Sequence, residues 1–454
     1  MKNRFSTLII GLTCSIYLGA QENQKCGTEV PSQQWEDEFQ KLITDFKQKQ
    51  QLNKPVQTTA YTIPVIFHVI HGGEPAGTFP NISQGQINSQ ITVLNQDCSG
   101  TGYNVGNYPT NAFANWAIAQ GLPSANIDAN GRVKIADFGI QFCLAEKDTL
   151  GNILQEPGID RINFNTKGWS NPNTYTATTT LRTFMNGTVK PQSIWNPAKY
   201  LNIWVSDRNS AIMVTGFASM PPLSTLTGIA DVGTDTTDGI WCYGKALGSY
   251  ILCPSGTYAA PQVTGRTITH EVGHWLGLRH IWGDGSCASD YCNDTPPATT
   301  QNVGSPTYPL NAGSCSSPNN SPDGEMFMNF MDYSSDPNKY MFTVDQMTRA
   351  LTAMANSPYR NQLGTHGLCS VITAVDKNSI VDNSLTLYPN PTSGTIHVSY
   401  ENNQVESIKV YSSSGSLLFE SLQPDLSVET LPAGIYFLVV RAQGSVVTTK
   451  VIKQ

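Results

Sequence analysis

The sequence predicts two folded units, a mixed α/β (α+β) domain and a small C-terminal all-β sandwich. Its 454 residues are more than one typical domain holds. Strand-like and helix-like segments alternate as far as about residue 369, a pattern typical of a mixed sheet covered by helices. From residue 384 onward, short strand-like runs separated by Pro, Asn and Gly indicate an antiparallel sandwich.

The composition is that of an exported globular protein. Hydrophobic residues make up 39% of the chain, which is ordinary, while charged residues make up only 13%, about half the usual quarter. The net charge is −7 and no basic block is present, so we expect no nucleic-acid partner.

Residues 1–20 are typical of a signal peptide. Lys2 and Arg4 precede a short apolar run, and Gly19-Ala20 offers a small-residue cleavage point. A membrane anchor is the alternative, but the run is too short to span a bilayer and no other long apolar stretch follows. We therefore expect a secreted or cell-surface protein with no transmembrane span in its mature form.

Residues 21–55 are expected to form a removable prosegment. Apolar residues recur there at a spacing of three to four, which predicts one amphipathic helix: Trp35, Phe39, Leu42, Ile43 and Phe46. A polar run and Pro55 follow this helix, which favours a segment that is cut away. An ordinary helix of the main domain is the alternative.

The main domain is expected over residues 56–369. The apolar run Thr62–Ile70 predicts a buried strand, and Ser83 is placed to cap the helix that follows. Further strands are predicted at residues 140–145 and 200–205, and further helices at residues 267–278 and 343–355.

The strongest local signal is a histidine-rich motif. His270 and His274 are four residues apart, so on a helix both imidazoles lie on one face and reach one ion at about 2.0–2.1 Å. Gly277 can end the helix with a positive φ and let the chain return His280 as a third ligand. Three protein ligands leave one position open, as in catalytic zinc sites. Glu271 is placed to take the proton of an attacking water.

The motif from His270 to His280 resembles that of the metzincin zinc proteases. The segment Met328–Tyr333 resembles the methionine turn of the pappalysin family, with Met331 as the turn methionine. The resemblance covers the main domain and implies a metzincin-like fold with a twisted sheet and an active-site helix. It also implies that Tyr333 lies near the metal and stabilises the tetrahedral intermediate. Plain core packing is the alternative role for Met331.

The same resemblance implies a specificity pocket. Asp336 lies five residues after the turn methionine and matches the acidic residue at the base of the family's pocket. A buried carboxylate selects a cationic partner, which implies a preference for Arg, or Lys, on the C-terminal side of the cut. A solvated loop aspartate is the alternative.

A calcium site is also implied. The segment from Asp290 to Pro296 resembles the family's calcium loop, in which Asp290 would offer its carboxylate, and Asn293 and Thr295 their carbonyl oxygens. A turn rich in Asp and Asn is the alternative.

One cysteine of the exported chain is left without a partner. Of ten cysteines, Cys14 leaves with the signal peptide, so an odd number remains. Cys26, in the segment Lys25–Thr28, resembles a cysteine switch, in which a prosegment thiolate fills the open zinc position at about 2.3 Å. A disulfide from Cys26 to the mature domain is the alternative.

Two disulfides are expected among the other cysteines. Cys287 and Cys315 match one bridge of the family, and Cys242–Cys253 is a plausible local pair. The sequence departs from the family in lacking the second usual bridge, because Pro337–Tyr340 stands where its cysteine would follow the methionine turn. The pairing of four cysteines stays open: Cys98, Cys143, Cys292 and Cys369.

After a polar linker at residues 370–383, residues 384–454 resemble the type A sorting domain of the type IX secretion system. The resemblance implies that the type IX machinery is a partner and carries the protein through the outer membrane of a Bacteroidetes-type bacterium. A carbohydrate-binding or adhesive sandwich is the alternative. The motifs that carry the resemblance are Leu387–Gly394, Val410–Tyr411, Leu431–Tyr436 and Lys450–Gln454.

Together these features predict a secreted zinc endopeptidase that acts on protein or peptide substrates and is made as a zymogen. A zinc-binding surface adhesin with an inactive protease fold is the alternative from another class, and the intact Glu271 argues against it. A metal-dependent deacetylase or esterase is the alternative among enzymes, and Tyr333 with Asp336 favours peptide hydrolysis instead.

Overall fold

The computed structural model divides into two compact units, residues 1–371 and 372–454. It describes residues 26–52, 61–222, 232–316, 320–369, 385–400, 405–412, 417–442 and 445–454. The expected signal peptide and linker lie outside these residues. Within the described ranges, no helix combines the length and apolar character needed to cross a membrane.

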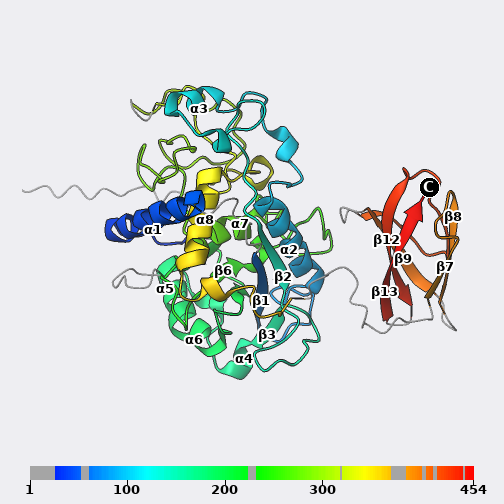
Figure 1. Ribbon diagram of the computed structural model, residues 1–454. Helices are drawn as coiled ribbons and strands as arrows, with labels where there is room; N and C mark the ends of the chain where they lie inside the picture. Colours follow the sequence, from blue (N-terminus) through cyan, green and yellow to red (C-terminus); the bar gives the residue numbers. More distant parts are fainter. Residues whose placement is uncertain are drawn as a thin grey trace, which may run out of the picture. The chain divides into compact units, whose positions relative to one another are not determined.

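A six-stranded sheet is the framework of the first unit (Figure 1). Its order is β2-β1-β4-β6-β5, and β3 pairs with β1 beyond the end of β2. All pairs are parallel except that of β5, which lies antiparallel to β6 at the edge. The strands are β1 Tyr61–His71, β2 Ile140–Leu144, β3 Ile159–Asn163, β4 Leu201–Ser206, β5 Gly216–Ala218 and β6 Ile240–Tyr243.

Both faces of this sheet are covered, which explains why β1 and β4 are apolar without alternation. Phe67 of β1 and Ile203 of β4 face a core that they share with helices α2 and α7. Ile70 and Trp204 point to the opposite face and pack against α5. The mostly parallel sheet with helices packed on it confirms the predicted α/β class.

Helix α2 begins at its expected cap, and α8 begins at a capping residue as well. Ser83 accepts a hydrogen bond from the Gln86 amide at 3.2 Å, and Thr343 forms a capping box with Gln346. Helices α1 and α8 lie side by side (Figure 1). The helices are α1 Gln33–Leu52, α2 Gln84–Cys98, α3 Ala114–Gln120, α4 Phe164–Lys167, α5 Thr178–Phe184, α6 Lys190–Ser193, α7 Arg266–Trp275 and α8 Val344–Asn356.

Helix α7 ends at Trp275, earlier than the predicted Leu278. Gly277 adopts φ +88°, and the amide of Leu278 turns back to the carbonyl of Gly273 at 2.9 Å. A residue in the left-handed conformation ends a helix with this kind of bond. The apolar residues of the sequence pattern therefore continue past the last helical residue.

The second unit is a sandwich of two antiparallel sheets, as predicted. Their orders are β10-β9-β12-β13 and β11-β8-β7. Ile396 and Leu426 of the smaller sheet share one core with Val410 and Leu438 of the larger. The strands are β7 Leu385–Tyr388, β8 Thr395–Tyr400, β9 Val405–Ser412, β10 Leu417–Ser421, β11 Asp425–Ser427, β12 Gly434–Ala442 and β13 Ser445–Lys453.

Among the described residues of the first unit there are two disulfides. Cys287 is bonded to Cys315, and Cys143 of β2 is bonded to Cys369 near the end of the unit. The expected bridge between Cys242 and Cys253 was wrong, because both thiols are free. Cys242 points into the core from β6 and donates to its neighbour's carbonyl, whereas the Cys253 thiol lies half-buried beside Ser255.

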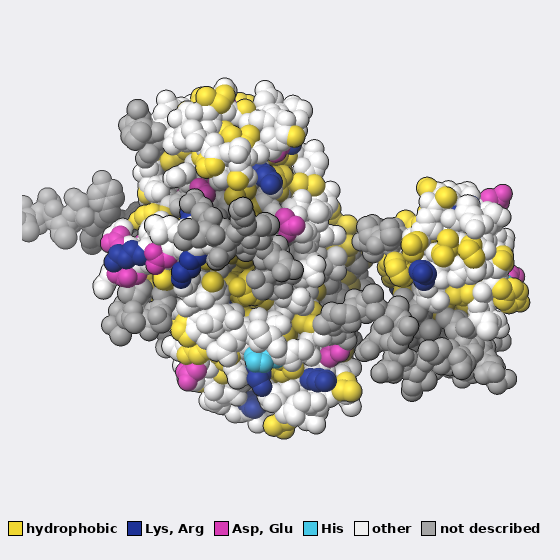
Figure 2. All heavy atoms as spheres, in the orientation of Figure 1, with side chains coloured by type: hydrophobic (Ala, Val, Ile, Leu, Met, Phe, Trp, Pro, Cys, Tyr) yellow, Lys and Arg dark blue, Asp and Glu magenta, His cyan; other side chains and the backbone are white. Residues whose placement is uncertain are grey.

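The surface matches the low charge of the sequence. On the face drawn in Figure 2, charged side chains are scattered, apart from a mixed-sign group on α1. This distribution offers no basic patch on that face.

Candidate metal centre

Helix α7 is held rigidly in the core, and every one of its residues is buried. Arg266 at its start is paired with Asp97 of α2 at 2.9 Å, with both side chains 1% exposed. Asp97 also accepts a hydrogen bond from Thr269 at 2.7 Å. Two contacts one turn apart therefore fix how α7 is rotated against α2.

The three predicted histidines converge on one point. Nε2 of His274 lies 3.1 Å from Nε2 of His270 and 3.1 Å from Nε2 of His280. Two nitrogens bound tetrahedrally to one zinc ion at about 2.0–2.1 Å would lie about 3.3 Å apart. The sulfur of Cys26 joins them, and the four ligand atoms all lie within 4.8 Å of one another. The donor set therefore fits zinc in both spacing and chemistry.

The opposite nitrogen of each ring is occupied by a hydrogen bond. A carbonyl or carboxylate can only accept, so each Nδ1 carries the hydrogen and each Nε2 keeps its lone pair for a metal. The accepting groups are, in order for His270, His274 and His280, the Phe330 carbonyl at 2.7 Å, the Leu278 carbonyl at 2.9 Å and the Asp284 carboxylate.

Burial also favours the neutral form of the rings. Desolvation and the neighbouring His274 and His280 rings lower the pKa of His270 well below its usual value. Desolvation, followed by the charge of His280, lowers the pKa of His274 to about 3. Neutral imidazole is the form that binds a metal, so these rings need not lose a proton first.

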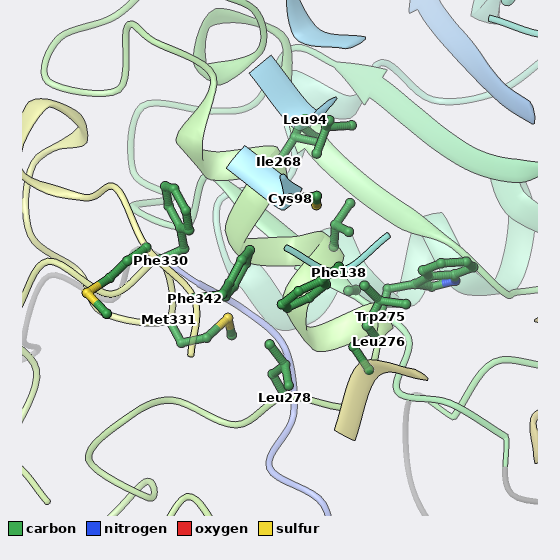
Figure 3. Packing of buried hydrophobic residues seen from close by; sticks show 14 of the residues in the cluster. Leu94, Cys98, Phe138, Ile268, Trp275, Leu276, Leu278, Phe330, Met331 and Phe342 are labelled. Atoms are coloured by element: carbon green, nitrogen blue, oxygen red, sulfur yellow. The ribbon is translucent and has the colours of Figure 1, made fainter. Parts of the chain in front are cut away.

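Two glycines of the motif are required by close packing. An added Cβ on Gly273 would lie 2.3 Å from the sulfur of Met331, and one on Gly277 would lie 2.9 Å from the Phe39 ring. Met331 lies among packed apolar side chains that include Leu278 (Figure 3). The methionine turn therefore packs directly under the histidine helix.

Glu271 lies beside the converging rings and below the edge strand β5. Burial raises the pKa of its carboxyl group to about 8. Its Oε2 accepts a hydrogen bond from the Thr28 hydroxyl at 2.9 Å and lies 3.6 Å from the Cys26 sulfur. A Cβ on Gly216 of β5 would lie 2.7 Å from Cγ of Glu271, so only glycine leaves room for this carboxylate.

The segment that carries Cys26 forms a parallel bridge to β5. Cys26 is bridged to Gly216, and the Gly27 amide donates to the Gly216 carbonyl at 2.8 Å. The Ala218 amide donates to the Thr28 hydroxyl at 2.8 Å. Burial, followed by the charge of Glu271, raises the pKa of the Cys26 thiol.

Tyr333 also reaches the centre. Its hydroxyl lies 3.2 Å from Nε2 of His280. Trp282 stacks on His280 with ring centroids 4.3 Å apart and meets Tyr333 edge-on at 4.9 Å. Burial raises the pKa of Tyr333, which keeps it a hydrogen-bond donor.

Asp336 lines a small hollow beside Glu271, which Thr267, Ser334 and Lys339 also line. Its side chain is 2% exposed, so it is no solvated loop aspartate. One carboxylate oxygen, Oδ2, accepts from the amide of Thr264 at 3.0 Å.

The three residues of the expected calcium loop lie in one turn. The Asp290 carboxylate accepts from the Thr295 hydroxyl at 2.7 Å, and burial raises the pKa of Asp290 to about 7. The Asn293 carbonyl accepts from the Trp116 ring nitrogen at 3.3 Å. Among the described residues, the histidine and Cys26 group is the one cluster of His, Cys, Asp and Glu side chains with metal-ligand spacing.

Sequence reasoning missed four residues of the centre: Thr28, Gly216, Asp284 and Lys339. Only Asp284 left a local signal, since it follows His280 by four residues, where a second carboxylate can orient a ligand ring. The others reach the centre through contacts between distant parts of the chain.

Comparison with known proteins agrees with this geometry. Residues 183–355 match the peptidase family described as pregnancy-associated plasma protein-A, and residues 386–454 match the secretion system C-terminal sorting domain. The chain is similar to extracellular metalloprotease 1 of Coccidioides posadasii, with 42% identity over 21% of this chain and 32% of that protein. It is also similar to an extracellular metalloprotease of Aspergillus fumigatus, with 30% identity over 37% of this chain and 51% of that protein. These matches span about a third to a half of the relatives' lengths.

Two solved structures match over nearly their whole length. Mirolysin in complex with compound 9 is 30% identical, over 68% of this chain and 98% of that chain, with a TM-score of 0.51. A Tannerella forsythia promirolysin mutant is 30% identical, over 75% of this chain and 97% of that chain, with a TM-score of 0.55. The expected export is confirmed by the sorting-domain match, and the chain belongs to the pappalysin family of zinc metalloproteases.

Proposed function

We propose that the chain is a secreted zinc endopeptidase that is made in a latent form. The convergence of three imidazoles and the Cys26 sulfur beside Glu271 carries this proposal. The three histidines would hold zinc, which when bound supplies Lewis-acid activation of water and of the substrate carbonyl. Cys26 stands where the fourth ligand would be, so it would have to leave before substrate enters.

The protein's own side chains divide the remaining chemistry between them. Glu271 takes the proton of the attacking water and passes it to the leaving amine. The Tyr333 hydroxyl, fixed by Trp282, donates to the oxygen on which negative charge develops. After the Cys26 segment has left, the substrate lies extended along the edge of β5 to which that segment pairs in this structure.

Replacing Glu271 by Gln tests the assigned base. We expect processed Glu271→Gln to bind zinc at the wild-type ratio and to lose casein cleavage by at least about a hundredfold. Zinc is measured by mass spectrometry and cleavage by release of soluble peptides. The matched control is Asp235→Asn, an exposed site in the same unit. Wild-type cleavage by Glu271→Gln would refute the base, and a processed wild-type protein that binds zinc without cleaving anything would favour the adhesin alternative.

Latency is supported by the position of the Cys26 segment. The segment covers the β5 edge, and the Thr28 hydroxyl donates a hydrogen bond to the Glu271 carboxylate. Arg182 of α5 donates to the Gly27 carbonyl and to the Glu29 carboxylate, and these bonds attach the segment to α5. The match to promirolysin covers more of this chain than the match to mirolysin, 75% against 68%. We infer that residues 21–55 are a prosegment, that residues 1–20 are a cleaved signal peptide and that the catalytic domain spans residues 56–369.

Removing the Cys26 thiol tests the switch. We expect the unprocessed Cys26→Ala chain to cleave a peptide substrate at once, whereas the unprocessed wild-type chain stays silent until its prosegment is cut. The measurement is the initial rate on a quenched fluorescent peptide, with the intact precursor verified by mass. Cys253→Ala, a free half-buried cysteine in the same unit, is the control. Equal latency of Cys26→Ala and wild type would contradict the switch.

Helix α1 anchors the same segment through a buried ion pair. Glu36 binds Arg349 of α8 through two contacts of 2.6 and 3.1 Å, and neither side chain is more than 1% exposed. Arg349 also donates to the carbonyl of Gly277 in the zinc motif at 3.0 Å. The Trp35 ring nitrogen donates to the Pro221 carbonyl at 3.4 Å. Through Arg349, helix α1 is therefore linked to the turn that positions the third histidine.

Neutralising Glu36 tests this anchor. Breaking a buried ion pair leaves an unpaired charge and costs about 3–5 kcal/mol. We expect Glu36→Gln to weaken binding of a separately made peptide of residues 24–52 to the processed enzyme by at least a hundredfold, measured as its inhibition constant. Asp37→Asn changes the neighbouring exposed acid and should leave the constant unchanged. Equal inhibition by the Glu36→Gln and wild-type peptides would rule out the anchor.

We also infer finer assignments that rest on the family resemblance. Asp336 would select Arg or Lys after the cut, and residues 384–454, joined by the linker 370–383, would be read by the type IX machinery. Asp290, Asn293 and Thr295 would bind calcium. The calcium assignment is supported by the resemblance of the segment Asp290–Pro296 to the family's calcium loop, whose carboxylate and carbonyl oxygens are hard ligands of the kind that Ca²⁺ prefers.

Calcium removal tests that loop. We expect a calcium-specific chelator to lower the Tm of the Glu271→Gln protein, which cannot digest itself, and added calcium to restore it. In Asp290→Asn the chelator should have no further effect. A Tm of the parent that does not respond to calcium would exclude the site.

A further inference from the structure

A buried lysine lies in the hollow beside the metal centre. Lys339 lines it together with Asp336, and the two stand three residues apart around the short turn Asp336–Asn338. The ammonium Nζ of Lys339 is 3.9 Å from Oδ1 of Asp336, with side chains 7% and 2% exposed. Within the described part of the chain, this ammonium makes no hydrogen bond, and the residue lines the hollow.

The backbone of Lys339 is fixed, which keeps its side chain in this place. Its carbonyl accepts from Arg266 at 2.6 Å and from the Asn104 amide group at 3.2 Å. Arg266 is itself held by Asp97 of α2. The lysine therefore belongs to the framework under α7.

Asp336 has only one oxygen left for a substrate. Oδ2 accepts from the Thr264 amide at 3.0 Å, from the Thr264 hydroxyl at 3.3 Å and from the Arg266 amide at 3.4 Å. Oδ1 is the oxygen that faces Lys339. A guanidinium binds a carboxylate best through both oxygens, and that geometry is not open here.

We propose that Lys339 is a specificity-determining residue, whose ammonium competes with a cationic substrate side chain for Oδ1 of Asp336. This inference rests on the proposed peptidase function and on Asp336 as the pocket acid. The Lys339 charge offsets that of Asp336, and a substrate Arg or Lys meets a like charge on entering the hollow. The unaltered enzyme therefore favours Arg only weakly over an uncharged side chain of the same shape. Without the ammonium, the same pocket favours Arg strongly.

The test uses processed enzyme and three peptides that differ only in the residue after the cut: Arg, citrulline or Leu. Citrulline has the shape of Arg without its charge, so the ratio of kcat/KM for Arg over citrulline measures charge selection alone. The variants are Lys339→Met, Lys339→Gln, Asp336→Asn and the double variant Asp336→Asn/Lys339→Met. The control is Lys134→Met, an exposed lysine of the same unit.

We expect the Arg-to-citrulline ratio to rise at least about tenfold in Lys339→Met and Lys339→Gln and to stay unchanged in Lys134→Met. In the Asp336→Asn background the Lys339 change removes only the like-charge repulsion, so the rise should be clearly smaller than in the Asp336 background. Because the ratio is taken within one enzyme preparation, partial unfolding cannot produce it, and the Gln variant decides if the Met variant does not fold.

Two other results would overturn the inference in distinguishable ways. If Asp336→Asn abolishes Arg selection but both Lys339 variants keep the wild-type ratio, Lys339 plays no part and the proposed function stands. If the ratio stays near one in every variant, Asp336 is not the selecting acid. If no peptide is cut, the peptidase assignment itself is wrong.

Discussion

The centre depends on three hydrogen bonds that fix the imidazole rings. Each Nδ1 donates to an acceptor on a different stretch of chain, namely the methionine turn, the turn after α7 and Asp284. If any of these acceptors moved, its ring could rotate or bind a proton on Nε2, and the lone pairs would no longer meet. The fold around the site can be understood as the means of holding these three acceptors still.

The methionine turn contributes in two ways to this arrangement. The Phe330 carbonyl orients His270, while the Met331 side chain packs against Gly273, where no Cβ fits. Core packing and metal-site function are thus one role for Met331 rather than alternatives. The turn after α7 is equally tied to its surroundings, because Gly277 contacts Phe39 and its carbonyl accepts from Arg349. Helix α1 therefore contacts the metal motif itself.

Local signals in the sequence predicted the parts of the site that lie on one helix or cap. The spacing of His270 and His274 and the cap Ser83 depend only on neighbours within a few residues, and the structure has them where they were expected. Strands β3, β5 and β6 are three to five residues long and carry no pattern that would distinguish them from loops. Bonds between distant segments were also beyond local patterns: Cys143 pairs with Cys369 across 226 residues.

Asp336 shows the limit of inferring a binding preference from a motif alone. A carboxylate at the base of a pocket indicates a cationic ligand only while no internal cation balances it, and Lys339 stands three residues further along the same turn. Its effect could not be inferred from the sequence alone, because a lysine on a turn usually extends into solvent. Here Arg266 draws the Lys339 carbonyl under α7, and the side chain is thereby directed into the hollow rather than away from it. The same arginine that pairs with Asp97 at the start of the histidine helix therefore also holds the backbone of this lysine.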